Sequence, residues 1–548
     1  MSQVANERLS YVSNLYEEED KSRELLMQKI TEAGGIELHY RGEMRLPIEK
    51  YYFTGEMLSN YEPCSDALQA VIDAEGEDDD AWNAFENYIE KFMDFSWCSK
   101  WDGKRYDLVL YGVSGYTGYL TMQYLLRAAF KRTPEPFTVA FAGRTASKVV
   151  AMRDRNFTGT QWADIPVLSA TYDDPMTMMD LAKSARAIIN VAGPYMLNPG
   201  ELLIDSCCWS GTHYFDINGE IPWMLRCCEL HQRAIDGDVM ICPAAAVAGC
   251  YPQILTELLF QKIQEEYGDK EDLKDVCCLC NAGGTGGGSS GGTLATRFAM
   301  SSASDEVRKA MADPYALGGF IPDRDASGIK LFTIKAGTGE VTMKTRKTDA
   351  DAYLSKLQED KANGFWKAPH VYAFFDTRMA RRTNAILADM LGKPWGTNLT
   401  WTEFFMVMPE YLEVMQAANA GSKGAAGEKE ALEAAGKYYK QGEGPALEDL
   451  GDAFIGFNVI AETVNGIIAK NGGCGGDGYF ETARCAIECA LASVFDRDEC
   501  PIKGGCLPAN CCVAKPAMGR MINAGFKFEA NRWLNQDEWV PPDINKTD

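Results

Sequence analysis

Histidine is scarce in this chain, with four in 548 residues. So few histidines leave no basis for a His-rich metal site. Long hydrophobic runs are missing as well. No stretch of about 18 or more apolar residues occurs, so we expect no membrane-spanning helix. The first residues lack the charged and then apolar pattern of a signal peptide, and we therefore expect a protein that is not secreted.

Positive charge is also in short supply. The chain has 54 Lys and Arg against 78 Asp and Glu, which gives a formal net charge of −24. Such a charge repels a phosphate backbone and an anionic bilayer, so we expect no nucleic-acid partner. The 46% hydrophobic and 11% aromatic content is that of a globular protein. The length is sufficient for two or three domains with their own cores.

The chain contains 18 cysteines. In a large unsecreted protein these are expected to be reduced thiols that act as small core side chains. Cys277 and Cys280 have the spacing of metal ligands, but they lie in an expected strand and no second pair has a comparable setting. We therefore predict no metal site.

The most informative segment is 106–118, where a buried-strand pattern leads directly into three glycines at three-residue spacing. Gly112 permits the tight turn, and Gly115 lets the backbone approach a pyrophosphate. Gly118 lets the next helix, expected from 119 to about 130, pack closely on the strand with its first amides facing the phosphates. The pattern predicts a dinucleotide site, with cofactor-binding residues Gly112, Ser114, Gly115, Tyr116, Thr117 and Gly118.

The next strand, expected at 137–142, indicates which nucleotide binds. A site that prefers NAD offers a carboxylate at this strand end, whereas this chain offers Gly143, Arg144, Thr145, Ser147 and Lys148. We expect Arg144 to hold the 2′-phosphate of NADP(H), with help from the neighbouring hydroxyls or Lys148. NADP(H) is thus favoured over NAD(H). In the alternative interpretation, Arg144 and Lys148 belong to a solvated corner.

Further short apolar strands are expected at 165–169, 187–191, 213–217 and 238–242, with helical or polar stretches between them. This alternation predicts an α/β fold with a doubly wound parallel Rossmann sheet. Ligands bind at the carboxyl ends of such strands. Ala192, Gly193 and Pro194 follow one of these ends and are therefore further cofactor-binding candidates.

We expect four segments in the chain: an acidic helical extension (1–104), the Rossmann domain (105–250), a second mixed α+β domain (251–500) and a C-terminal segment (501–548) that packs back on the Rossmann domain. The extension carries 23 acidic and 10 basic side chains. It is expected either to cap the Rossmann domain or to bind a partner, within a homodimer or a larger complex. In the second domain we expect a helix at 251–267, a strand at 275–281, a turn beside the substrate cleft at 283–293 and a hairpin at 454–469.

Several motifs match those of a known family. The chain reads GVSGYTG at 112–118, AGR at 142–144, NVAGPY at 190–195 and GTHYFDINGE at 211–220. These motifs resemble the saccharopine dehydrogenase-like oxidoreductases. Later segments follow in the same order as in that family: 290–293, Asp376, 381–382, 442–445, 478–482, 503–505 and 523–528.

The resemblance implies an NADP- or NAD-dependent Rossmann domain that is joined to a second α+β domain. The sequences of these motifs are most similar to those of trans-acting enoyl reductases of lipid biosynthesis and of lipid-droplet-associated homologues. It implies reduction of a C=C or C=O bond in a small or lipid-like substrate. The expected place is the cytoplasm, with peripheral association with a lipid droplet or another organelle as the alternative.

The chain departs from the family pattern after the last Rossmann strand. Relatives carry an aspartate where this chain has Gly249, so a polar group that would line the pocket near the nicotinamide is expected to be missing. Either the substrate differs or the chemistry has been lost. The alternative function is therefore an inactive, nucleotide-binding scaffold subunit of a larger assembly.

Catalysis would need a proton donor near the nicotinamide. Tyr195 follows a strand end and carries a hydroxyl, and His213, Asp216 and Glu220 follow at the next strand. These four residues are the catalytic candidates. Each also has a structural interpretation: Tyr195 shapes the cofactor pocket, His213 packs at a strand start, and Glu220 caps the next helix.

Overall fold

Most of the chain after residue 102 is described by the computed structural model. The described residues are 103–130, 136–284, 288–304, 313–320, 329–335, 340–346, 357–361, 363–413 and 432–530, two strands at 35–38 and 51–54, and a few single residues between these ranges. Most of the predicted acidic extension lies outside the described residues. Its two described strands, β1 (Gly35–Leu38) and β2 (Tyr51–Thr54), form an antiparallel pair, so this part is not helical.

The first large sheet is the predicted Rossmann sheet, and all of its pairings are parallel. Its strands run in the order β17-β8-β7-β6-β3-β4-β5. Their bounds are β3 (Tyr106–Tyr111), β4 (Val139–Gly143), β5 (Val167–Ser169), β6 (Ala185–Asn190), β7 (His213–Asp216), β8 (Met240–Cys242) and β17 (Gly505–Cys506). The reversal of order beside β3 places the carboxyl ends of β3, β4 and β6 together, which is where such sheets bind ligands.

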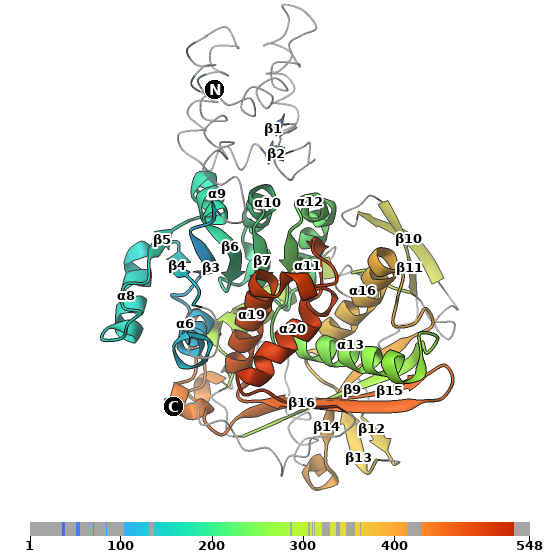
Figure 1. Ribbon diagram of the computed structural model, residues 1–548. Helices are drawn as coiled ribbons and strands as arrows, with labels where there is room; N and C mark the ends of the chain where they lie inside the picture. The colour runs from blue at the N-terminus through green and yellow to red at the C-terminus, as the bar shows by residue number, and fades with distance from the viewer. Residues whose placement is uncertain are drawn as a thin grey trace, which may run out of the picture.

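Helices cover both faces of this sheet (Figure 1). On one face lie α9 (Pro175–Ser184), α10 (Glu201–Ser210), α11 (Ile221–Glu229) and α12 (His231–Asp236). On the other lie α6 (Tyr116–Tyr124), α19 (Gly478–Phe495) and α20 (Ala509–Asn523), while α8 (Ala146–Phe157) contacts β4 and β5. Helix α19, which the sequence places in the second domain, thus packs on the Rossmann sheet.

The second large sheet is mixed and has the order β12-β13-β14-β9-β15-β16-β18. Only the β14 and β9 pair is parallel. The strands are β9 (Leu273–Gly283), β12 (Gln358–Asp360), β13 (Phe365–Ala368), β14 (Thr400–Val407), β15 (Phe454–Thr463), β16 (Ile468–Gly475) and β18 (Lys527–Ala530). The hairpin expected at 454–469 is the β15–β16 pair, and a separate pair joins β10 (Ile329–Lys335) and β11 (Glu340–Arg346).

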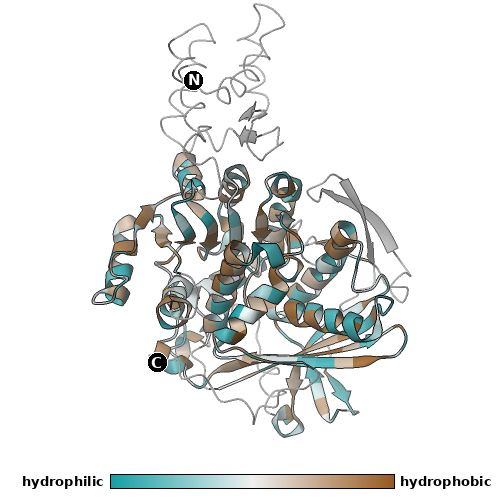
Figure 2. Ribbon diagram, viewed as in Figure 1, coloured by the Kyte–Doolittle hydropathy of each residue, from teal (hydrophilic) through white to brown (hydrophobic). Residues whose placement is uncertain are grey.

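One hydrophobic core runs from the Rossmann sheet to the second sheet. Helices α13 (Val247–Tyr267) and α16 (Ala373–Leu391) lie between the two, and Figure 2 shows hydrophilic and hydrophobic residues alternating along both. Their apolar faces enter the core, as amphipathic helices do. Every cysteine among the described residues is a free thiol, and all of these except Cys277 are buried, as expected for core side chains.

The C-terminal segment joins both sheets. β17 extends the Rossmann sheet beside β8, and β18 extends the second sheet beside β16. Within the described part of the chain, no helix is long and apolar enough to cross a membrane.

Candidate active site

The glycine turn connects β3 to α6. Gly112 has φ +96°, a conformation that favours glycine, and a Cβ at Gly118 would lie 2.4 Å from the Val113 Cα. Helix α6 therefore packs directly on the turn. It begins at Tyr116, three residues earlier than expected, so Tyr116, Thr117 and Gly118 lie in its first turn. The N-cap residue Gly115 has no capping side chain, which leaves the first amides of α6 available to an anion.

The tip of β4 lies beside this turn. The Gly112 amide donates to the Ala142 carbonyl at 2.9 Å, so β4 ends at the same edge as β3. Gly143 is buried, whereas Arg144, Thr145, Ser147 and Lys148 are exposed. Arg144 is thus an exposed residue at the end of the strand that lies beside the glycine turn.

The strand end of β6 completes the edge on the other side. A Cβ at Gly112 would come within 2.8 Å of the Ala192 Cβ, so Ala192 lies against the turn. Gly193 and Pro194 follow, and the Gly193 carbonyl accepts a hydrogen bond from Gln441 Nε2 at 3.3 Å. The cofactor candidates at β3, β4 and β6 are thus gathered at one edge of the sheet.

Tyr195 points inward. Its hydroxyl donates to the Asn190 carbonyl at 2.8 Å and accepts from the Ile217 amide at 3.4 Å. Its ring stacks on Trp223 at 5.9 Å between centroids. Burial raises the pKa of the phenol well above its usual value. These contacts agree with the interpretation in which Tyr195 shapes the pocket.

Glu220 fixes the segment that contains Tyr195. Its carboxylate accepts from the Tyr195 and Met196 amides at 3.1 and 2.6 Å, and from Thr296 Oγ1 at 3.0 Å. It stands at the N-cap position of α11 but makes no capping bond there. The interpretation of Glu220 as a helix cap is therefore wrong, because its carboxylate is already occupied by the 195–196 turn.

Asp216 and His213 lie at opposite ends of β7. Asp216 is fully buried and accepts five hydrogen bonds, including those from Trp223 Nε1 at 2.7 Å and the Ala244 amide at 2.9 Å. His213 begins the strand, far along it from the carboxyl edge. Its Nδ1 accepts from the Met240 amide at 3.0 Å and its Nε2 contacts Arg497 at 2.7 Å. The structure thus places His213 as a packing residue at a strand start.

The second domain supplies a group of hydroxyls opposite the glycine turn. Tyr479 Oη accepts from the Ser290 amide at 2.6 Å and lies 3.1 Å from Thr293 Oγ1. The Tyr479 ring meets the Tyr116 ring edge-on, with centroids 5.4 Å apart. We call Ser290, Thr293 and Tyr479 the hydroxyl cluster. Since its tyrosine touches the first helical residue after the glycine turn, it faces the proposed nucleotide site.

The segment 440–444 lies between Tyr116, the first residue of α6, and Gly291, which follows Ser290 of the hydroxyl cluster. A Cβ at Gly444 would lie 2.6 Å from the Tyr116 ring, and a Cβ at Gly291 would lie 1.7 Å from the Lys440 carbonyl. Only glycine permits contacts this close. The segment therefore wedges between the glycine turn and the start of α14 (Gly291–Ser301), which is the border of the cleft predicted for 283–293.

Sequence comparison identifies proteins that are similar over most of this chain. A provisionally named trans-acting enoyl reductase of Mycobacterium tuberculosis is 26% identical over 441 residues, which cover 78% of this chain and 98% of that protein. A trans-acting enoyl reductase of Mycobacterium bovis is 24% identical over 450 residues, with the same coverage. The chain is a homologue of the trans-acting enoyl reductases. No family model matches it.

Two solved structures show distant likenesses. Saccharopine dehydrogenase (L-Glu forming) of Saccharomyces cerevisiae aligns with a TM-score of 0.41 at 12% identity, over 78% of this chain and 99% of that one. The WlbA dehydrogenase of Thermus thermophilus, in complex with NAD and UDP-GlcNAcA, has a TM-score of 0.31 at 11% identity, over 76% of this chain and 94% of that one.

In this enoyl reductase homologue, another element supplies a carboxylate at Gly249. The Gly249 amide donates to Asp376 Oδ1 at 2.5 Å, and Asp376 lies in the first turn of α16. Gly249 has φ +78°, and a Cβ there would come within 2.9 Å of the Ala244 Cβ. A side chain at position 249 would therefore be strained. Asp376 therefore places a buried carboxylate beside Gly249, while the expected loss of a polar group near the nicotinamide stays a prediction.

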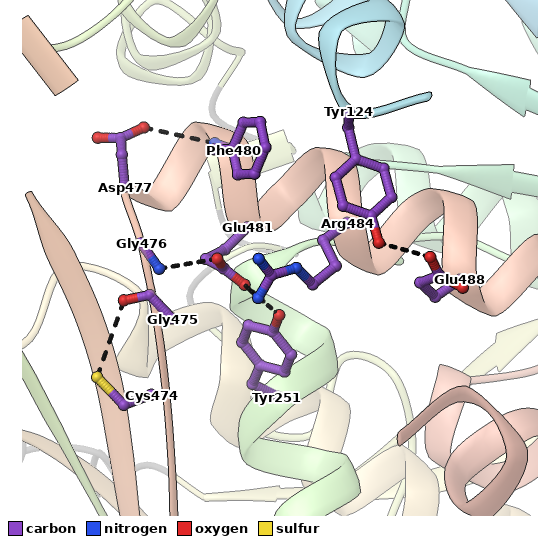
Figure 3. Close-up of polar contacts among 10 residues, drawn as sticks. All are labelled: Tyr124, Tyr251, Cys474, Gly475, Gly476, Asp477, Phe480, Glu481, Arg484 and Glu488. Atoms are coloured by element: carbon purple, nitrogen blue, oxygen red, sulfur yellow. Dashed lines mark hydrogen bonds and ion pairs between the residues drawn. The ribbon is translucent and has the colours of Figure 1, made fainter. Parts of the chain in front are cut away.

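A buried network holds the start of α19, the helix that contains Tyr479; Figure 3 shows its contacts around Glu481. Tyr251 Oη donates to Glu481 Oε2 at 2.5 Å, Arg484 pairs with the same oxygen at 3.1 Å, and the Gly476 amide donates to Glu481 Oε1 at 2.8 Å. Tyr124 of α6 donates to Glu488 Oε1 at 2.5 Å. The network ties α6, α13, α19 and the end of β16 together and so fixes Tyr479 relative to the glycine turn.

Sequence reasoning did not assign functions to the residues of the hydroxyl cluster or to Asp376. Ser290, Thr293, Asp376 and Tyr479 all lie in segments that follow the family order, and this order was the available signal. It showed that these segments resemble those of the family but not that their side chains meet in space. Among the described residues, no group of His, Cys, Asp and Glu fits a metal ion.

Proposed function

We propose that this protein is an NADP-dependent oxidoreductase that reduces a C=C or C=O bond of a small or lipid-like substrate. The observation that carries the proposal is the open N-terminus of α6, framed by the glycine turn, Ala192 and the exposed Arg144. Backbone amides there suit the pyrophosphate and Arg144 suits the 2′-phosphate. The bound nicotinamide would supply the hydride. The homology to trans-acting enoyl reductases supports a C=C bond of an enoyl group as the first candidate substrate.

The protein itself must supply a proton to the reduced substrate. We assign this role to Tyr479 in place of Tyr195, since the Tyr195 hydroxyl already donates to a strand carbonyl. Tyr479 accepts from the Ser290 amide, which leaves its own proton to donate to Thr293 or to a ligand. Glu220, Asp216 and Tyr195 then position the 192–196 turn beside the nicotinamide, and His213 has a packing role.

The first test is a fluorescence titration of the purified full-length chain with NADPH and NADH. We expect NADPH to bind more tightly, and Arg144→Ala to weaken NADPH binding by about 30-fold or more, or about 2 kcal/mol, while NADH binding is unchanged. Arg153→Ala is the matched control, because Arg153 pairs with Asp154 on the outer face of α8. Equal loss in both variants would contradict the role of Arg144.

The second step is NADPH oxidation with enoyl thioesters, enones and ketoacids. Reduction of compounds from one of these classes would identify the class of the substrate. If neither nucleotide binds, the oxidoreductase proposal is wrong. If NADPH binds and no class is reduced, the alternative of an inactive scaffold subunit is favoured, and native mass measurement should then show a stable complex with other proteins.

A further inference from the structure

Two carboxyl groups meet in the interior beside Gly249. Asp376 and Glu403 are both fully buried, and each carboxyl affects the pKa of the other. Asp376 comes from α16 and Glu403 from β14 of the second sheet. A hydrogen bond between two carboxyls requires a proton on one of them, because two ionised carboxylates can only accept.

The partners of the other oxygens support a single shared proton. Asp376 Oδ1 accepts from the Gly249 amide, and Glu403 Oε1 lies 2.5 Å from His370 Nδ1. Asp376 Oδ2 and Glu403 Oε2 are buried and have no hydrogen-bond donor beside them. One proton between these two oxygens would satisfy both, whereas two ionised carboxylates would leave both unpaired in a buried place.

The pair lies near the carboxyl edge of the Rossmann sheet. Gly249 belongs to the connection after β8, at the carboxyl edge of the Rossmann sheet. The ring of His370 meets the Tyr372 ring edge-on at 5.3 Å, and Tyr372 is 36% exposed. Burial raises the pKa of Tyr372, and the neighbouring Tyr479 and Asp376 raise it further. His370 and Tyr372 therefore lead from the buried pair towards the hydroxyl cluster.

We propose that Asp376 and Glu403 share one proton and act as the proton reservoir of the cleft. The reservoir role rests on the proposed reductase function, whereas the shared proton does not. In the reduction, hydride from NADPH brings two electrons and forms a C–H bond as the π bond breaks, and the resulting anion takes one proton from the hydroxyl cluster. The pair returns that proton to the cluster through His370 and Tyr372 and is itself reprotonated from water. Asp376 and Glu403 are thus positioning residues that act through Tyr479.

The titration of the surrounding groups agrees with this arrangement. Burial raises the pKa of Glu403 to about 8 and that of Asp376 well above its usual value. The groups that face the pair are His370, Tyr372 and the thiols of Cys278 and Cys280 on β9. Burial also raises the pKa of both thiols, so they stay neutral near neutral pH.

Infrared difference spectroscopy of the full-length protein tests the shared proton without any cofactor or substrate. At neutral pH we expect the C=O stretch of a protonated carboxylic acid, which shifts in heavy water and disappears in both Glu403→Gln and Asp376→Asn. In either variant the amide donates to the remaining carboxylate, which then ionises. Glu462→Gln, a surface residue paired with Lys274, is the control and should keep the band. A band absent from the wild type, or kept in both variants, would overturn the shared proton.

The reservoir role is tested by turnover. For a substrate found by NADPH oxidation, Glu403→Gln should lower kcat by about tenfold to a hundredfold with KM little changed, and it should remove the fall of kcat as pH rises through about 8. A variant that loses the infrared band but keeps kcat and its pH profile would leave the pair with a structural role only. If the wild type reduces nothing, the reservoir role fails with the proposed function, while the infrared result still decides the shared proton.

Discussion

Hydrogen-bond partners distinguish the residues that hold the site in place from those that can react in it. Tyr195, Asp216 and Glu220 have their polar atoms bound to the backbone or to neighbouring side chains. Tyr479 is partly exposed and has a hydroxyl proton that is not committed to the backbone. Among the single residues, Tyr479 is therefore the proposed proton donor, and Asp376 is a proposed positioning residue that acts through Tyr479.

Tyr479→Phe tests the proton donor. We expect NADPH binding to stay within about twofold and turnover to fall by about 10²-fold or more, since a positioned general acid contributes that much. Stopped-flow NADPH oxidation measures the effect. Tyr267→Phe, at a tyrosine that is 57% exposed on the end of α13, is the control. Unchanged turnover in Tyr479→Phe would assign the donor elsewhere.

The acid pair predicts how stability depends on pH. Burial raises the pKa of Glu403 to about 8, so the folded state keeps a proton that the unfolded chain has already released. The stabilising contribution is complete below the ordinary pKa of a glutamate and is lost as pH rises through about 8. We expect the free energy of unfolding to fall over this range in the wild type and to vary less in Glu403→Gln. Urea unfolding between about pH 5 and pH 9 measures it. If the free energy of unfolding depended equally on pH in both proteins, the raised pKa of Glu403 would be contradicted.

At the scale of elements, the site is made by close contacts between backbone segments. The glycine turn meets α6 and β6 with no room for side chains, and the 440–444 segment lies equally close to α14. Helix α19 presents Tyr479 because the Glu481 network fixes its first turn (Figure 3). Small displacements of these elements would therefore separate the hydroxyl cluster from the glycine turn.

Gly118→Ala tests the contact between α6 and the turn. The new Cβ would lie 2.4 Å from a backbone atom, which cannot move as the end of a side chain can. We expect NADPH binding to be lost and the melting temperature to fall. Gly219→Ala is the matched control, because a Cβ there meets nothing within 4 Å. Normal NADPH affinity in Gly118→Ala would show that the turn does not bind the cofactor.

Tyr251→Phe tests the network around Glu481. The variant removes a buried hydroxyl that donates to the carboxylate, and it should lower the free energy of unfolding by about 1 to 3 kcal/mol. Denaturant unfolding gives the value, and Tyr267→Phe again serves as the exposed control. An effect as small as that of the control would mean that Arg484 and the Gly476 amide satisfy Glu481 without Tyr251.

At the scale of the whole molecule, the two sheets share their covering helices. Helix α13 contacts α16, α19 and α20 as well as β15 and β16, and the C-terminal segment adds a strand to each sheet. The predicted boundaries near residues 250 and 500 therefore separate segments of the sequence that share one core.

This shared core predicts cooperative unfolding. Exposing either sheet would expose the apolar faces of α13 and α19, so we expect the described body to unfold in one calorimetric transition. Calorimetry on the full-length chain, with and without NADPH, measures this. Two separate transitions with only one shifted by NADPH would show that the sheets are independent.

The sequence predicted those parts of the fold that depend on local pattern. The strands β3 to β8 of the Rossmann sheet were predicted because each is a short apolar run next to a turn or helix, whereas β17 was not. Gly112, Gly115 and Gly118 marked the turn between β3 and α6. The interior partners of Tyr195 and Glu220 could not be predicted. Those partners belong to residues 5 to 76 positions away in the chain, whose approach depends on packing.

The sequence by itself determined the Rossmann sheet and the family, because glycine spacing and strand periodicity are local properties of the backbone. Only the tertiary structure decided which acid stands beside Gly249 and which tyrosine faces the glycine turn. Asp376 lies 127 positions from Gly249, and Tyr479 lies 189 positions from Ser290. Such pairs meet because two sheets pack around α13 and α19, and no short-range pattern in the sequence records that contact.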